Sequence, residues 1–417
     1  MSVDDPSAGD PSVDELLAEA QRQLTICNSC RYCEGYCAVF PAVERHTVIA
    51  EGDITHLANL CHDCRACYYA CMYAPPHEFG VNPPAILGEI RRATYDTYLR
   101  HPRLPGWLAR GERAGRGLGG PGLPEPGLPG RRCAHHGLTA AAGLVGALIV
   151  ALVALTEGIG ALWAPRHPAG SPYGVISYPA LLVTVALPSA WSVALMLRAA
   201  GRYWHDTHGP LRDLADPRAL GRALGYAASL RYLRGGGEDC SYPQDAPSPV
   251  RRRLHAAVSY GFAACFAATV AAAVLQDFLG SPPPYPPLSA PVILGTGGGI
   301  AMISGCTGLI VLKRRSDPAP AAGAAVADYG LLIGLEALAV TGILTLLLRT
   351  TAAFGLMLVI HLTTIVVCIA VAPYTTFAHF IYRFLAIMHD NLAAEAQRAG
   401  VRPGPRTGPD RSRHSRK

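Results

Sequence analysis

The chain has 417 residues, of which 50% are hydrophobic and only 16% are charged, and its formal net charge is +6. A soluble globular protein carries about 25% charged residues, so this composition argues against a soluble protein and indicates a membrane protein. The basic residues gather in loops between apolar runs, which accounts for the net charge without a nucleic-acid partner.

The N-terminal part of the chain, residues 1–110, is polar and rich in cysteine. Its acidic start, residues 1–17, lacks the basic region and apolar core of a signal peptide, and it has no twin arginine. We therefore expect this part to stay in the cytoplasm, where thiols remain reduced. A disulfide framework is disfavoured for the same reason.

Eight of the thirteen cysteines form two runs of the pattern C-x2-C-x2-C-x3-C, the second starting 34 residues after the first. The two runs are Cys27, Cys30, Cys33, Cys37 and Cys61, Cys64, Cys67, Cys71. This pattern binds [4Fe–4S] clusters, and in two-cluster proteins the fourth cysteine of each run binds the other cluster. Zinc sites usually consist of two C-x2-C pairs instead.

We therefore predict two [4Fe–4S] clusters with crossed ligands. The first is held by Cys27, Cys30, Cys33 and Cys71, and the second by Cys61, Cys64, Cys67 and Cys37. The sequence departs from the usual pattern in one respect, because Ala38 and Met72 stand where proline normally follows the fourth cysteine.

The residues around the two runs favour a small helical ferredoxin-like domain. Asp53 is expected to cap a short helix through Leu57 and Leu60. The nearby histidines are interpreted as surface residues or as neighbours of the thiolates: His46, His56, His62 and His77. The remaining cysteines are interpreted as free thiols in loops or apolar helices: Cys133, Cys240, Cys265, Cys306 and Cys368.

A linker rich in glycine and proline, residues 111–136, separates this domain from a membrane domain, residues 137–390. Six apolar runs in the membrane domain are long enough to cross a bilayer: 138–163, 174–197, 255–279, 291–312, 328–348 and 352–374. The last run is expected to continue as a helix to Met388, past Pro373. Residues 391–417 are expected to form a basic disordered tail. The predicted fold class is all-α.

The loops predict the orientation of the six spans. The loop 198–254 contains ten arginines and six acids, Lys313 and two arginines follow the fourth span, and the opposite loops hold only Arg166 and Arg349. The positive-inside rule then places both termini in the cytoplasm, in the inner membrane of a bacterium. Within this loop, Asp216 and Pro217 begin an amphipathic helix, interpreted as lying on the membrane surface or, alternatively, as docking a partner.

Histidines at membrane depth are the candidates for cofactor binding. His255 starts the third span and His379 ends the sixth, so they lie at the same cytoplasmic level and can hold a b-type haem between them. The alternative is that both reach toward lipid headgroups. His361 lies 18 residues before His379, about 27 Å along a helix. It is a candidate for a quinone contact, a ligand of a second haem, or a hydrogen bond between helices.

Other polar residues of the membrane domain have weaker interpretations. His205 and His208 are reserve ligands or loop histidines, and Glu157 and Glu336 relay protons or form structural pairs. The stretch "GTGGG" at 295–299 is expected to let two helices pack closely.

The stretches "CNSCRYCEGYCAVFPAVE", "GDITHLANLCHDCRACYYAC" and "YAPPHEFGVNPP" resemble the tricarballylate-utilisation B family, also called CitB-like, over roughly residues 20–100. The same module resembles the C-terminal half of a flavoprotein fusion from cobalamin biosynthesis. The resemblance implies two [4Fe–4S] clusters and a haem-bearing membrane part. It also implies a flavoprotein (FAD) partner that oxidises tricarballylate to cis-aconitate, and transfer of its electrons to quinone.

Spans three to six resemble the γ subunit of respiratory nitrate reductase, on "RRRLHAAVSYGF" and "APYTTFAHFIYRF". That family holds two b haems on four histidines. Cys265 stands at the position of the fourth histidine, so one haem is expected here and two haems are the alternative.

We therefore predict a membrane-bound electron-transfer protein that passes electrons from a flavoprotein dehydrogenase, through two clusters and haem b, to quinone. No catalytic site for an organic substrate is expected, since no nucleophile motif or nucleotide-binding loop is present in the sequence. One alternative is a membrane-anchored redox sensor. Another is the electron-transfer subunit of a different flavoprotein system, heterodisulfide-reductase-like or cobalamin-biosynthesis-like, and a third is a transporter with an accessory cluster domain.

Overall fold

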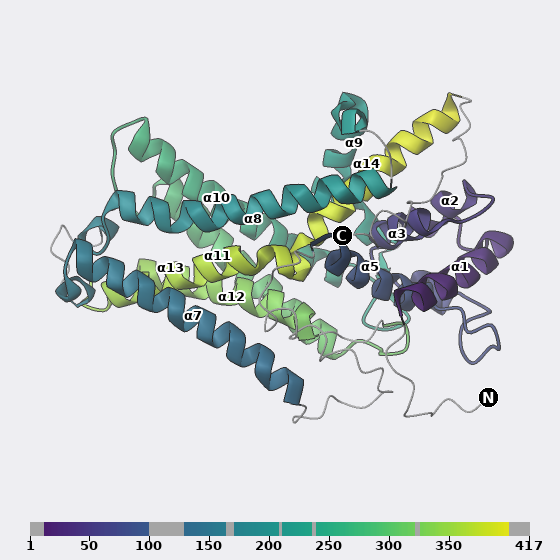
Figure 1. Cartoon of the computed structure of the whole chain (residues 1–417), viewed down its shortest axis with the longest axis horizontal. Coiled ribbons are helices and arrows are strands. Elements are labelled where there is room, and N and C mark those ends of the chain that lie inside the picture. The colour runs from purple at the N-terminus through teal and green to yellow at the C-terminus, as the bar shows by residue number, and fades with distance from the viewer. Residues whose placement is uncertain are drawn as a thin grey trace, which may run out of the picture.

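The structure is a computed structural model that describes residues 12–99, 129–163, 171–207, 211–235, 239–321 and 326–399. It is built almost entirely of helices, which confirms the all-α prediction. Within these ranges the only strands are β1 (Cys240–Ser241) and β2 (Pro247–Ser248), which form one antiparallel hairpin. Five helices form the N-terminal domain, and the rest belong to the membrane domain and the loops that contact the N-terminal domain (Figure 1).

The N-terminal domain consists of α1 (Val13–Cys30), α2 (Val39–Glu44), α3 (Glu51–Leu60), α4 (Ala66–Tyr69) and α5 (Pro83–Leu99). Ser12 caps α1 through a reciprocal pair of hydrogen bonds with Glu15. The expected helix over 53–60 is present but starts earlier, because Ala50 is the N-cap. Asp53 lies in the first turn, where its carboxylate accepts a hydrogen bond from the Ala50 N–H at 3.1 Å.

Six helices in the described part of the chain are long and apolar enough to cross a membrane, as the sequence predicts. They are α7 (Pro129–Thr156), α8 (Tyr178–Thr207), α10 (Val250–Asp277), α11 (Ala290–Arg314), α12 (Val326–Leu347) and α13 (Phe354–Val371). They form an elongated bundle with the N-terminal domain at one end (Figure 1). Large apolar side chains such as Leu148, Leu187 and Phe266 are exposed on it, which suits a lipid environment.

The boundaries of α7 and of the terminal segments bear on the predicted linker and tail. Helix α7 begins at Pro129, inside the range 111–136 that was assigned to the linker. Residues 111–128 of that linker lie outside the described residues. The predicted tail starts too early, because helix α14 (His379–Arg398) continues past residue 391; residues from 400 onward lie outside the described residues. Two short 3-10 turns, η1 (Ile159–Leu162) and η2 (Pro172–Gly174), lie between α7 and α8.

The "GTGGG" stretch packs α11 closely against α10, as expected. A Cβ added at Gly298 would lie 2.7 Å from the Gly261 carbonyl oxygen and 2.9 Å from the Cys265 sulfur. Helix–helix association in a bilayer depends on such close backbone contact, because lipid tails are as apolar as the side chains. Gly297, one residue away, has no atom within 4 Å of its added Cβ.

This difference gives a matched pair of substitutions. Gly298→Ala should destabilise the membrane domain by about 1–3 kcal/mol, the usual effect of overpacking. Gly297→Ala should be neutral or slightly stabilising, since alanine is the better helix former. Unfolding of the purified proteins by heat or by SDS in detergent micelles would measure both. Equal stability of the two variants would contradict this packing.

The sixth span does not continue as one helix to Met388, and this expectation is wrong. Helix α13 ends at Val371, and the 3-10 turns η5 (Ala372–Tyr374) and η6 (Thr376–Ala378) follow before α14 (His379–Arg398) begins. Pro373 lacks the N–H that a continuing helix needs, and the next turn is broken by Thr375, whose φ of −113° and ψ of 173° are extended. The Thr375 hydroxyl accepts a hydrogen bond from the Phe377 N–H. Because of this break, the distance calculated for a straight helix between His361 and His379 does not apply.

The loop between α8 and α10 contains η3 (Leu211–Ala215), α9 (Pro217–Ala228) and η4 (Arg231–Arg234). Asp216 caps α9 by accepting hydrogen bonds from two backbone N–H groups at 2.8 Å, so the predicted start is confirmed. The alanine face of α9, Ala219 and Ala223, is buried and packs on α14, and Arg222 pairs with Glu395. This intramolecular partner was not expected from the sequence.

Helix α14 also joins the N-terminal domain to the bundle. The Tyr382 ring stacks on Tyr95 of α5 with centroids 5.2 Å apart, and it contacts Tyr203 of α8 at the same distance. Further along α14, the His389 ring lies 4.5 Å from that of His56. The three tyrosines belong to one buried apolar cluster that includes residues of both domains. The cysteine loops are therefore held against one defined end of the bundle.

Candidate functional site

The two cysteine runs fold into similar loops. Cys27 and Cys30 lie in the last turn of α1, and Cys61 directly follows α3. In each loop the arginine after the second cysteine, Arg31 or Arg65, has a left-handed backbone with φ of 58° or 65°. Residues other than glycine rarely adopt this conformation. The repeat in sequence is thus also a repeat in backbone geometry.

The first three cysteines of the first run lie beside the last cysteine of the second run. Burial, together with the nearby sulfurs of Cys71, Cys33 and Cys30, raises the pKa of the Cys27 thiol to about 12. Burial likewise raises the pKa of the Cys33 thiol to about 11, with Cys71 again as the sulfur that has the largest effect. Such thiols stay protonated at neutral pH unless a metal displaces the proton.

The converse holds for the second run, whose thiols lie beside Cys37. Burial raises the pKa of the Cys37 thiol well above its usual value, and Cys64 and Cys61 add to the effect. Burial also raises the pKa of the Cys67 thiol, with Cys64, Cys37 and Cys61 as the main sulfur neighbours. All eight thiols are free. This donor set fits two cubane clusters, each of which takes four thiolates.

The second set of thiols lines a cavity. Cys37, Cys61, Cys64 and Cys67 face it together with apolar side chains of α2, α3 and α5, such as Phe40. Within the residues that the structure describes, no three His, Cys, Asp or Glu side chains converge closely enough to hold a single metal ion. The thiols therefore do not form a site for a single ion; four of them line one cavity instead.

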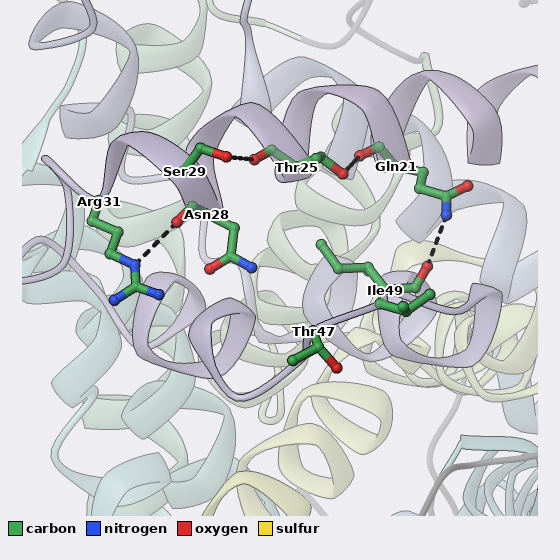
Figure 2. A pocket seen from close by; sticks show the side chains of 8 residues that line it. Gln21, Thr25, Asn28, Ser29, Arg31, Thr47 and Ile49 are labelled. Carbon is green, nitrogen blue, oxygen red and sulfur yellow. Dashed lines mark hydrogen bonds between the residues drawn. The ribbon is translucent and has the colours of Figure 1, made fainter.

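The first set of thiols lies nearer to the surface. Cys30 is exposed, and an open polar pocket lies on another face of the C-terminal half of α1 (Figure 2). Gln21, Thr25 and Asn28 of α1 form one wall of this pocket. The Gln21 amide bridges to the other wall by donating a hydrogen bond to the Ile49 carbonyl at 3.2 Å. No cysteine is among the residues that line this pocket, so it is the exposed Cys30 that opens the first set to solvent.

His255 and His379 lie next to each other, as their positions in the spans predict. Their ring centroids are 6.4 Å apart and the ring planes are nearly perpendicular, at 84°. A bond between a metal and an imidazole nitrogen is about 2 Å long, so two imidazoles on opposite sides of one iron have centroids about 6 Å apart. The separation therefore fits an axial pair of ligands.

The hydrogen bonds of this histidine pair also suit metal binding. The His379 Nδ1–H donates to the Thr376 carbonyl at 2.6 Å, which leaves Nε2 unprotonated. Nδ1 of His255 is paired with the Ser259 hydroxyl at 3.1 Å. Burial and the neighbouring Arg383 lower the pKa of His379 to about 4, so the imidazole is neutral at neutral pH. A neutral imidazole held at its other nitrogen is the usual form of a metal-bound histidine.

His361 has a different environment. Its Nδ1 lies 2.9 Å from the Thr341 hydroxyl of α12, and that hydroxyl donates to the Ala337 carbonyl, so the imidazole donates to Thr341. The ring covers Gly342, where an added Cβ would lie 3.0 Å from it. No second imidazole contacts the His361 ring among the described residues. A hydrogen bond between helices is therefore present, and the quinone contact and the second haem remain predictions.

The remaining candidates have local partners. His205 is exposed beside Asp206, His46 pairs with Asp53, and Glu336 accepts a hydrogen bond from Thr307 of α11 at 2.5 Å. His208 lies outside the described residues. The Thr307 contact is the structural pairing that was one alternative for Glu336. His205 lies in the last turn of α8 and not in a loop.

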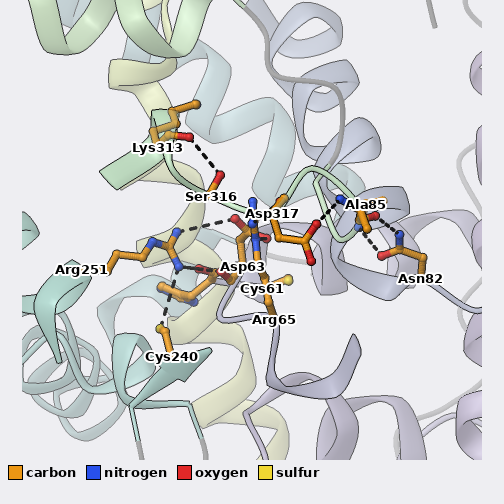
Figure 3. A network of polar contacts seen from close by, with 12 residues as sticks. Cys61, Asp63, Arg65, Asn82, Ala85, Cys240, Arg251, Lys313, Ser316 and Asp317 are labelled. Carbon is orange, nitrogen blue, oxygen red and sulfur yellow. Dashed lines mark hydrogen bonds and ion pairs between the residues drawn. The ribbon is translucent and has the colours of Figure 1, made fainter. Parts of the chain in front are cut away.

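A network that sequence reasoning missed ties the second cysteine loop to the bundle (Figure 3). Arg251, one turn before His255 on α10, donates hydrogen bonds to the carbonyls of His62 and Asp63 at 3.1 and 2.5 Å. The Ser241 N–H of the β1–β2 hairpin donates to the Cys64 carbonyl at 2.9 Å. The loop that carries three of the thiols is thus fixed directly to the helix that carries His255. The four-residue spacing between Arg251 and His255 was visible in the sequence.

A second group of contacts in the same network comes from the loop after α11. Arg65 donates a hydrogen bond to the Asp317 carbonyl at 3.0 Å, and the Tyr69 hydroxyl donates to the Asp317 carboxylate at 2.9 Å. Asn82 donates to the Ala319 carbonyl at 2.9 Å. Two membrane loops therefore hold the second cysteine loop.

Comparison with known proteins gives a consistent result for both parts of the chain. Residues 20–97 match the profile of the citrate utilization protein B Fer4-like domain, and residues 131–400 match that of citrate utilization protein B. The curated citrate utilization protein B of Escherichia coli is 37% identical over 382 residues, covering 90% of this chain and 92% of that protein. No solved structure was found to match.

Proposed function

Because the chain belongs to the citrate utilization protein B family, we propose that it is a membrane-bound electron-transfer protein. It takes electrons from the reduced flavin of a partner dehydrogenase and delivers them to the quinone pool. The Fer4-like domain and the eight free thiols support the iron–sulfur part of this proposal. The six apolar helices support the membrane location.

The observation that carries the proposal is the direct contact between the second thiol set and the His255 helix. Arg251 bonds the carbonyls of the cysteine loop one turn away from His255, and His379 faces His255 from α14. Two groups of metal-binding side chains therefore lie in series at one end of the bundle. A chain of closely spaced sites is what electron transfer requires.

Each group of residues has a separate role in this path. When bound, two [4Fe–4S] clusters and a b-type haem supply one-electron carriers between a two-electron flavin and quinone. The exposed Cys30 leaves the first set accessible to a flavoprotein, and the buried Cys64 and Cys67 keep water from the second set. Thr376 and Ser259 orient the imidazoles of His379 and His255.

The end of the bundle that contacts the cysteine domain is proposed to face the cytoplasm. The arginine-rich loop 198–254 and the residues after α11 both contact that domain, through Ser241 and Asp317. The positive-inside rule assigns such loops to the cytoplasmic side. The proposed location is the inner membrane of a bacterium, with six crossings and both termini in the cytoplasm.

The partner is proposed to be an FAD-containing dehydrogenase that acts on a tricarboxylate. The name of the Escherichia coli relative refers to citrate, and the sequence resemblance implies tricarballylate. Both molecules are tricarboxylates, so their oxidation by a partner is the common element. The present chain supplies no site for the acid itself in this proposal.

An absorbance experiment on the full chain in lipid nanodiscs tests the proposed function in the absence of the partner. Photoreduced flavin is added anaerobically as donor, and a short-chain ubiquinone analogue is then added as acceptor. The absorbance of clusters and haem should bleach with the flavin and recover with the quinone. Bleaching without recovery would contradict a quinone reductase. A preparation with no such absorbance would contradict the whole proposal.

A further inference from the structure

Arginine side chains surround the loop that carries three thiols of the second set. The Arg91 guanidinium of α5 donates hydrogen bonds to the carbonyls of Ala58 and Cys61, at 3.1 and 2.8 Å. Arg251 of α10 bonds the next two carbonyls of the same loop. Arg65 belongs to the loop itself and lines the thiol cavity. Three cations thus contact one stretch of five residues.

A fourth arginine, Arg383, approaches from α14, one turn after His379. Its Nε is buried and has no hydrogen-bond partner among the described residues. Asp63 offsets part of the positive charge, since it lies 3.4 Å from Arg65 and 3.7 Å from Arg251. Asp317 is the other carboxylate in contact with the network, through Tyr69. Four arginines and two carboxylates leave this shell positively charged.

The first thiol set lacks such a shell in the described structure. Arg31 and Glu34 follow its second and third cysteines in sequence, and both side chains are exposed, with opposite charges. Exposed charges act weakly, because water and salt screen them. The two thiol sets have the same donors but different electrostatic surroundings.

We infer that these arginines raise the reduction potential of the second cluster above that of the first, which directs electrons inward. The inference rests on the proposed function. A cubane cluster on four thiolates is an anion, and reduction adds negative charge. A buried positive shell favours the reduced form, and net charge and hydrogen bonds to sulfur are known to set cluster potentials.

Burial and the nearby backbone N–H groups act on the second cluster in opposite directions. Burial alone would disfavour the added negative charge and lower the potential. The backbone N–H groups of Val39 and Phe40 lie near the Cys37 sulfur, and that of Ala66 lies near Cys64. The positive ends of these groups favour the reduced form. The arginines add long-range attraction in a region where it is weakly screened. If the charge of these arginines is removed, burial should become the larger effect, and the reduction potential of the second cluster should fall.

The test is an EPR-monitored redox titration of the purified full chain. Cys67→Ala identifies the second cluster by the loss of its EPR signal. Arg91→Gln and Arg251→Gln should each lower the midpoint potential of that cluster and leave the other unchanged. Arg91→Lys and Arg251→Lys, which keep the charge, should restore most of the difference. A merely structural role would not distinguish lysine from glutamine in this way.

Two neighbouring arginines are matched controls. Arg92 follows Arg91 on α5 and pairs with Glu89, and Arg253 is exposed two residues after Arg251. Arg92→Gln and Arg253→Gln should leave both potentials unchanged. Equal shifts of both clusters, or no shift, or lysine variants as impaired as glutamine variants, would overturn the inference alone. Absence of cluster signals from the unmutated chain would overturn the proposed function as well.

Discussion

Cys71→Ala should eliminate the same cluster as Cys27→Ala, although its nearest cysteines in sequence, Cys64 and Cys67, are assigned to the other cluster. The reason is the crossed arrangement, in which Cys71 lies beside Cys27 and Cys33. About half of the cluster iron should be lost in each variant, because one of two cubanes is removed. EPR spectra of the reduced proteins, with iron analysis, would show which cluster remains.

The reciprocal substitution completes this experiment. Cys37→Ala should eliminate the cluster that Cys61→Ala eliminates, since Cys37 lies with Cys61 and Cys64. Cys265→Ala, in a membrane helix, is the control and should retain all of the iron. If Cys71→Ala instead reproduced the spectrum of Cys61→Ala, each run would hold its own cluster and the crossed assignment would be wrong.

His379→Ala and His255→Ala should each abolish haem binding, with near-complete loss of the Soret absorbance. The two imidazoles face each other at the spacing of an axial pair, and each has its Nδ1 engaged in a hydrogen bond. Loss of one ligand leaves a buried iron with a vacant position and a weakly held cofactor. The absorbance spectrum per milligram of purified protein measures the effect, and EPR of the clusters should be unchanged.

Two other histidines are controls for the haem experiment. His205→Ala, at an exposed position, should leave the haem content unchanged. His361→Ala should retain the haem as well, because the Thr341 hydrogen bond accounts for its position. Loss of the Soret band in His361→Ala with its retention in His379→Ala would show that the haem lies elsewhere in the bundle.

The features that the sequence predicts well depend on local spacing. The cysteine runs, the six apolar spans and the glycine contact at Gly298 are each set by residues close together in the chain. The capping residue Asp216 is of the same kind. Each of these features needs certain residue types at a short spacing, so the spacing in the sequence is enough to predict it.

The features that were missed depend on residues far apart in the chain. The apolar pattern continues on both sides of Pro373, which concealed the break that starts α14 at His379. The amphipathic pattern of α9 shows that one face is buried, but it does not say that α14 covers it. Arg91, Arg251 and Arg383 meet only when α5, α10 and α14 converge on the second cysteine loop. No local pattern distinguishes them from other basic residues of the chain.

The measurement that tests the central claim most directly is the content of non-haem iron, labile sulfide and haem in anaerobically purified full chain. The account predicts about eight irons and about eight sulfides per chain, together with haem. Iron far below this level, or zinc in its place, would contradict the claim that these thiols begin an electron path into the bundle.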